Sequence, residues 1–193
     1  MRQAPAGRYQ VTIGAEVIDT VIDDRATRDA VWERIADCCL PLSSSARGTA
    51  IDTLARELGV ALPAVPSDDY AAMDWNDLRG LDPALVEVGA HTCTHPILAH
   101  CDSAEQESEI SQCQSTIENE MQREVAAFCY PNGRREDFND ATLDILRRSR
   151  FTSAAVSYSG IIGSDTHPFM LPRIGASGDR TNFRMRIDGI YQR

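Results

Sequence analysis

The sequence contains no lysine, because all 19 of its basic residues are arginine. A chain without lysine cannot form a Schiff base through a lysine amine, and it cannot supply the lysine of a phosphate-binding P-loop. It also has no apolar run of the length that a membrane-spanning helix needs. Two kinds of lysine chemistry and a transmembrane helix are therefore excluded before any motif is considered.

Positive charge as a whole is scarce. The 19 arginines face 29 acidic residues, which gives a net charge of −10. Such a chain repels the phosphates of nucleic acids and anionic lipid surfaces, so we expect neither nucleic acid nor membrane as a partner. The oligomeric state cannot be read from the sequence. A length of 193 residues with 42% hydrophobic content is typical of one globular domain with a sizeable core.

Ordered cysteine patterns are also missing. The six cysteines follow neither a zinc-knuckle nor a disulfide-framework spacing, and Cys38 and Cys39 are adjacent. The stretch Met1–Tyr9 has no apolar core of the kind that secretory signals carry. Both observations favour reduced thiols and a cytoplasmic location.

Residues 1–80 have the pattern of a mostly helical N-terminal or inserted region. Arg8–Ile13 alternates and predicts a short strand or extended arm. Helical spacing follows, with Asp74 as the N-cap of the last segment and Asp77 at its capping-box position. The helical segments are expected at 16–25, 27–40, 47–60 and 68–81.

Residues 81–193 alternate between strand and helix patterns. Strands are expected at 86–90, 125–130, 151–158 and 169–174, and helices at 103–121, 141–148 and 181–191. This order with short connections predicts an α/β fold with a parallel sheet. In the first of these helices, Ser103 is the expected cap with Gln106 completing the capping box, and the glutamates are expected on its solvated face rather than in a metal site. We expect 1–80 and 81–193 to form one structural domain overall.

Two histidines follow a predicted strand, at a position where α/β proteins often place catalytic or metal-binding residues. His91 and His95 follow the apolar alternation of Val86–Ala90 and directly precede Pro96. Residues four positions apart on one helical turn lie on the same face, so both imidazoles could reach a single metal ion. On spacing alone, a pair of surface histidines on a turn explains the pattern equally well.

The surrounding residues favour the metal interpretation. Gly89–Pro96 resembles the histidine motif of the polysaccharide deacetylases, the NodB-homology family of carbohydrate esterases. Ala127–Gly133 resembles the next motif of that family, in its Tyr-Pro-Asn-Gly form, and a helical pattern separates the two. The resemblance implies a distorted β/α barrel with its metal at the carboxyl ends of the strands. In this chain we expect an incomplete barrel of that type, preceded by the helical segment.

The resemblance also implies a set of site residues. The family binds a divalent metal, usually zinc, through two histidines and an aspartate, and a neighbouring aspartate acts as base. Carried over by motif, His91 and His95 would be metal ligands, and the backbone N–H of Asn132 would stabilise the oxyanion. The other residues of the same turn would contact the substrate; these are Tyr130, Pro131 and Gly133.

Three departures from the family pattern accompany this resemblance. The aspartate pair has no match, because Asp23-Asp24 leads into a helical pattern and is interpreted as a helix cap. Cys129 stands where the family usually has an arginine, and no Leu-x-His motif follows Arg173. Cys93, between the two histidines, is expected to point away from them.

The sequence therefore predicts a metal-dependent hydrolase that removes N-acetyl or O-acetyl groups from a polysaccharide or amino sugar, in a truncated form. A carbohydrate substrate and a divalent metal, zinc in the first place, are the expected partner and cofactor. Two alternatives stay open. One is a non-catalytic relative that binds glycan or a partner protein, and the other is a histidine-based metal module unrelated to sugars.

Overall fold

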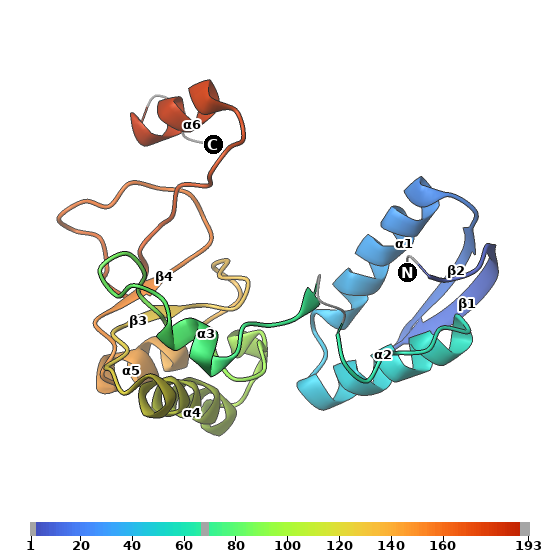
Figure 1. Ribbon diagram of the computed structural model, residues 1–193, viewed down its shortest axis with the longest axis horizontal. Coiled ribbons are helices and arrows are strands. Elements are labelled where there is room, and N and C mark those ends of the chain that lie inside the picture. Colours follow the sequence, from blue (N-terminus) through green and yellow to red (C-terminus); the bar gives the residue numbers. More distant parts are fainter. Residues whose placement is uncertain (1–2, 67–69, 190–193) are drawn as a thin grey trace. The chain divides into compact units, whose positions relative to one another are not determined.

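The computed structural model describes residues 3–66 and 70–189. Contacts divide the chain into two compact units, Met1–Ala72 and Met73–Arg193, which are described separately (Figure 1). The sequence predicts a boundary after residue 80. That boundary, and the assignment of both segments to one structural domain, stay predictions.

The first unit begins with an antiparallel hairpin of β1 (Gly7–Ile13) and β2 (Glu16–Ile22). The expected helical pattern over 16–25 is wrong for β2. Gly14, at φ +59°, allows the chain to reverse within two residues, so that Val11 pairs with Ile18. The period of two then puts Ile18 and Ile22 on one buried face.

Two helices pack on that hairpin, α1 (Arg25–Cys39) and α2 (Ser44–Glu57). The Asp24 side chain accepts a hydrogen bond from the Thr27 N–H, and the Thr27 hydroxyl lies 3.1 Å from the Asp24 backbone nitrogen. These two bonds form a capping box at the start of α1. The helix-cap interpretation of the Asp23-Asp24 pair is thus confirmed.

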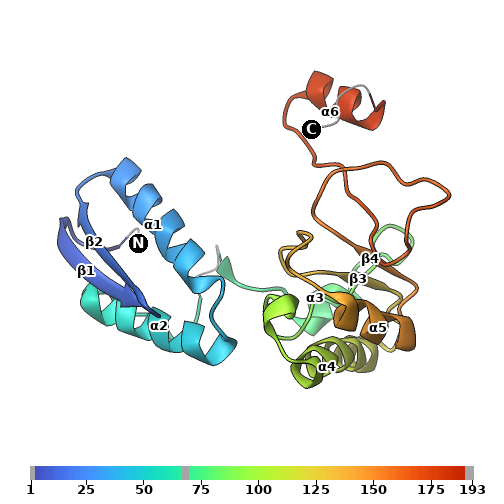
Figure 2. The same cartoon turned by 180° about the vertical axis from the view of Figure 1, so that it is seen from behind.

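The second unit is organised around short parallel strands. β3 (Ala127–Cys129) pairs in parallel with β4 (Ser153–Ala155), and isolated parallel bridges join Ala90 to Phe128 and Ala155 to Leu171. Helices α4 (Ser103–Met121) and α5 (Asp140–Arg148) fill the connections and lie side by side along β3 and β4 (Figures 1 and 2). The mixed α/β class predicted from the sequence is confirmed.

A closed barrel is not formed by the residues that the structure describes, which contain two two-stranded sheets and the two bridges. All four expected strands of this unit are shorter than their patterns, and two of them reduce to the bridges at Ala90 and Leu171. Prolines limit the pairing near two of these strands. Pro131 follows shortly after β3 and Pro172 directly follows Leu171, and neither offers an N–H to extend a ladder.

Three further helical segments complete this unit. They are α3 (Trp75–Arg79), the 3₁₀ helix η2 (Leu98–His100) and α6 (Arg180–Ile187). The capping box of Asp74 and Asp77 at α3 is confirmed. Of the longer helix expected at 68–81, residues 68 and 69 lie outside the described part, and the helix that is described begins only at Trp75.

The cap of α4 differs from the expected one. Asp102 is the N-cap, and Glu105 rather than Gln106 completes the capping box. Gln106 is instead buried, and its side-chain amide oxygen accepts a 2.6 Å hydrogen bond from the Thr142 hydroxyl of α5. Since Asp102 already supplies the capping carboxylate, Gln106 is free to join α4 to α5.

None of the helices within 3–66 and 70–189 combines the length and the apolar composition that crossing a bilayer requires.

The C-terminal part of α4 is fixed to the strands through Glu118. Its carboxylate accepts a 3.1 Å hydrogen bond from the Val125 N–H, just before β3, and another from the guanidinium of Arg150, just before β4. The hydrogen bond from Arg150 in the first place, and then that from Val125, lower the pKa of Glu118. One carboxylate therefore links one helix to the entrances of two strands.

Replacing Glu118 by glutamine should lower the free energy of unfolding by about 1 kcal/mol near pH 7, because the charged partner of Arg150 is lost. Since the pKa of Glu118 is lowered in the folded state, its contribution is present above the unfolded pKa and disappears as the pH falls through the folded one. Urea unfolding should thus show a difference between wild type and E118Q that shrinks towards about pH 3.

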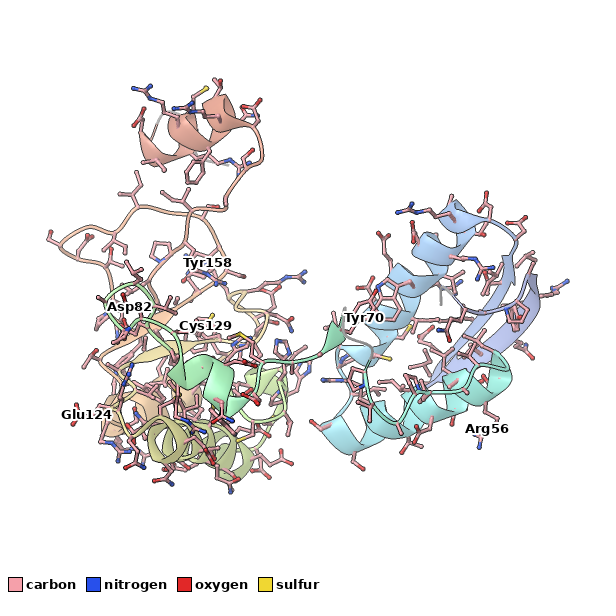
Figure 3. The ribbon with its side chains drawn as sticks, in the orientation of Figure 1. Arg56, Tyr70, Asp82, Glu124, Cys129 and Tyr158 are labelled. Atoms are coloured by element: carbon pink, nitrogen blue, oxygen red, sulfur yellow. The ribbon has the colours of Figure 1, made fainter. Side chains whose placement is uncertain are left out.

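Glu124→Gln is the matched control, because this exposed glutamate makes no hydrogen bond or ion pair to the described residues (Figure 3). An equal loss of stability in E124Q would contradict a specific role of Glu118.

Candidate active site

The imidazoles of His91 and His95 lie against each other at the carboxyl edge of the parallel strands. Their ring centroids are 4.8 Å apart and the ring planes meet at 78°. The His91 Nδ1 lies 2.7 Å from the carbonyl oxygen of Cys129, the last residue of β3. Because a carbonyl only accepts, Nδ1 carries the proton in the neutral ring and Nε2 of His91 keeps its lone pair.

The pair is built by a loop and not by a helical turn, which corrects the sequence-based geometry. Thr92 and His95 have left-handed backbones, at φ +67° and +57°. The His95 N–H donates to the Thr92 hydroxyl oxygen over 3.1 Å. The two rings thus meet across a bend at residues 93 and 94, although no helix connects them.

Glu109 of α4 holds the middle of this loop. Its Oε2 accepts hydrogen bonds from the backbone N–H groups of Cys93 and Thr94, at 2.8 and 2.9 Å, and its Oε1 accepts one from the Thr94 hydroxyl at 2.7 Å. The expectation that the glutamates of this helix only form a solvated face is therefore wrong for Glu109. The sequence contains one hint, since Glu109 stands beside Ile110 and one turn before Cys113, at the border of the buried stripe.

The turn 130–133 follows directly after the Cys129 carbonyl. Asn132 and Gly133 both have left-handed backbones, at φ +56° and +72°. The Gly133 carbonyl accepts a 2.8 Å hydrogen bond from the Ser157 N–H, and a Cβ on Gly133 would lie 3.0 Å from that nitrogen. Glycine is required here both for its backbone angle and for this close approach.

Within the described part of the chain, no hydrogen bond uses the Asn132 N–H. Asn132 is also the one residue of the turn that is partly exposed, because Tyr130, Pro131 and Gly133 are buried. The arrangement thus presents an unpaired backbone donor at the same edge of the sheet as the histidine pair.

Tyr130 belongs to the core. Its side chain is 1% exposed, stacks on Phe138 with centroids 4.1 Å apart, and donates its hydroxyl proton to the Phe169 carbonyl over 2.7 Å. Burial raises the pKa of this hydroxyl far above its usual value. In this structure the side chain faces no open surface, and the substrate-binding role given to Tyr130, Pro131 and Gly133 stays a prediction.

Cys129 and Arg173 complete the surroundings of His91. Contact with the Cys129 side chain raises the pKa of His91, an effect that its partial burial and the charge of Arg173 oppose. The same contact lowers the pKa of the Cys129 thiol against its burial. The Arg173 Nε donates to the Val156 carbonyl over 2.7 Å, so a backbone hydrogen bond holds the Arg173 side chain.

The described residues do not complete a metal site. His91 is oriented as a ligating histidine usually is, with its second ring nitrogen bonded to a backbone carbonyl. His95 offers a second nitrogen beside it, but no group of three His, Cys, Asp or Glu side chains within 3–66 and 70–189 could hold a metal ion. Zinc sites offer three protein ligands or more, so the pair supplies only part of one.

Comparison with known protein families identifies the family to which this chain is related. The family model for polysaccharide deacetylase matches residues 49–154, which is more than half of the chain and includes both the histidine loop and the 130–133 turn. The chain belongs to the polysaccharide deacetylase family. The resemblance that Gly89–Pro96 and Ala127–Gly133 indicated is confirmed.

Among solved structures, the Streptococcus pyogenes deacetylase PplD in complex with acetate is similar over 55% of this chain, at 22% sequence identity and a TM-score of 0.49. This chain spans 46% of the length of that one. The comparison with curated proteins gave no match.

Replacing Tyr130 by phenylalanine should lower the free energy of unfolding by about 1–2 kcal/mol, because a buried carbonyl of Phe169 loses its donor. Tyr158→Phe is the control, since that hydroxyl makes no hydrogen bond to the described residues. Thermal or urea unfolding measures both. Unchanged stability in Y130F would mean that the hydroxyl serves another purpose than the core.

Replacing Gly133 by alanine should cost about 1–3 kcal/mol of stability, because the new Cβ meets the Ser157 backbone in a left-handed conformation. At Gly178 an added Cβ would meet nothing within 4 Å, and G178A should leave stability nearly unchanged. Parallel urea unfolding of the two variants tests this, and equal midpoints would refute it.

Proposed function

We propose that the chain is part of a metal-dependent hydrolase that removes N-acetyl or O-acetyl groups from a polysaccharide or amino sugar. Membership of the polysaccharide deacetylase family supports the reaction class, which is hydrolysis of a carbon–nitrogen or ester bond in a carbohydrate. The observation that carries the proposal is the paired arrangement of His91 and His95 beside the 130–133 turn.

In this proposal His91 and His95 are two nitrogen ligands of a divalent metal, zinc in the first place. A bound metal would supply the Lewis acid that such a hydrolysis needs. The third protein ligand and the base would be carboxylates from outside the described residues. The proposal is thus a truncated form of the family's site, with the histidine half present and the aspartate half contributed elsewhere.

The Asn132 N–H is the proposed oxyanion donor. Preorganised backbone donors are effective because they are already oriented when charge develops on the substrate oxygen. Two features support Asn132: its N–H has no partner among the described residues, and Gly133, tied to Ser157, fixes the turn that presents it. Direct substrate contact would involve Asn132 first, with Tyr130, Pro131 and Gly133 forming the rest of this subsite.

The alternative is a non-catalytic relative that keeps the fold and binds glycan or a partner protein. Two observations favour it: residues 3–66 and 70–189 offer no third ligand beside the histidine pair, and Cys129 stands where the family usually has an arginine. The two functions differ in one measurable respect, because only the hydrolase uses the histidine pair to bind metal.

Zinc titration by calorimetry tests the histidine pair. Replacing His91 or His95 by alanine should weaken zinc binding at least about tenfold, because each removes one of the two nitrogen ligands. His100→Ala is the matched control, since this exposed histidine lies in η2 and outside the pair. Equal affinity in all variants would remove His91 and His95 as ligands.

Activity can be tested by adding the aspartate half of the proposed site. Fusing a βαβ unit that carries the aspartate pair of an active family member should produce acetate release from an N-acetylated polysaccharide, and a chelator should abolish it. Release that depends on both His91 and the added aspartates is the expected result. A correctly folded fusion without activity would favour the non-catalytic alternative.

A further inference from the structure

The loop between the two histidines has an external support in α4. Two consecutive backbone N–H groups, of Cys93 and Thr94, point at one carboxylate oxygen of Glu109, and the Thr94 hydroxyl bonds the other. All three bonds measure between 2.7 and 2.9 Å. A charged acceptor makes such bonds stronger than neutral pairs.

This support acts on a backbone that is not relaxed. Thr92 and His95, on either side of the two bonded N–H groups, both have left-handed angles that residues other than glycine rarely adopt. Such conformations persist only where the surroundings impose them. Among the described contacts, Glu109 accepts three hydrogen bonds from the middle of this loop, and the His95 N–H donates to the Thr92 hydroxyl oxygen.

We propose that Glu109 is a positioning residue, which holds the 92–95 loop in the shape that brings the rings of His91 and His95 together. It touches neither ring and acts through the backbone of Cys93 and Thr94. The inference concerns the geometry of the pair, and only its consequence for metal binding rests on the proposed function.

The role is specific to this glutamate. Glu105 completes the cap of α4, Glu107 pairs with Arg148 at 3.1 Å, and Glu118 binds Val125 and Arg150. Glu107 is therefore a matched control, because it lies on the same helix and loses an ion pair without touching the histidine loop.

Side-chain chemistry separates the role of the hydrogen bonds from that of the charge. The amide oxygen of a glutamine at 109 could accept both backbone N–H bonds, and its NH₂ group could donate to the Thr94 hydroxyl, which accepts as well as donates. E109Q should therefore keep the loop. E109A removes every acceptor, and E109D keeps the charge but shortens the reach by one methylene.

The direct test is the nuclear Overhauser contact between the ring protons of His91 and His95, measured without metal on isotope-labelled protein. Wild type, E109Q and E107A should show this contact, and E109A should lose it while its circular dichroism stays that of a folded chain. Retention in folded E109A, or an equal loss in E107A, would overturn the proposal. If E109A does not fold, the same nuclear Overhauser contact is measured in folded E109D. The shorter side chain of E109D should also lose the contact, and its retention there would overturn the proposal.

Amide hydrogen exchange in the wild type gives a measurement that needs no variant. The Cys93 and Thr94 amides should exchange at least about tenfold more slowly than unbonded loop amides, because both are held by Glu109. Exchange at the rate of a free loop would overturn the proposal.

Zinc titration connects the geometry to the proposed site. E109A should bind zinc about tenfold more weakly than wild type, and E109Q should recover most of that loss. If the wild type binds no zinc, the proposed function fails, but the ring contact and the amide exchange still decide whether Glu109 positions the pair.

Discussion

The parallel pairing of Ala90 with β3 is the constraint on which the candidate site depends. The Ala90 N–H donates to the Ala127 carbonyl at 2.9 Å, and the Cys129 N–H donates to the Ala90 carbonyl at 2.8 Å. These two bonds fix the residue after Ala90 against the carbonyl of Cys129, which is where the His91 ring binds. The same register starts the 130–133 turn one residue later. A single backbone register thus brings two motifs, far apart in the sequence, to one edge.

Much of this arrangement can be predicted from the sequence, because it depends on local rules. The apolar stripe of α4, the caps at Asp24 and Asp74 and the order of strands and helices in the second unit all follow from periodicity and capping chemistry. The family follows from the two short motifs, and the family model that matches residues 49–154 agrees with them.

The remaining features depend on contacts that no local pattern encodes. The four apolar residues of β2 fit a helical period, and only the pairing with β1 makes this segment a strand. Two of the short strands, β3 and the bridge at Leu171, are soon followed by Pro131 and Pro172, which cannot extend a ladder. Glu109 resembles its neighbouring glutamates in sequence, and only the folding of the 92–95 loop back onto α4 gives it three donors. The motif predicts that Tyr130 lines a substrate cleft, but its ring stacks on Phe138 and its hydroxyl donates to the Phe169 carbonyl.

The two glutamates of α4 that bind other segments have a consequence for how this fold can change. Glu109 binds the histidine loop from the first half of the helix, and Glu118 binds the strand entrances from its last turn. Each residue of an α-helix advances the side-chain direction by about 100°. An insertion or deletion of one residue between these glutamates would turn one anchor away while the other stayed in place. The nine-residue spacing of Glu109 and Glu118 along α4 must therefore be kept if both contacts are to form.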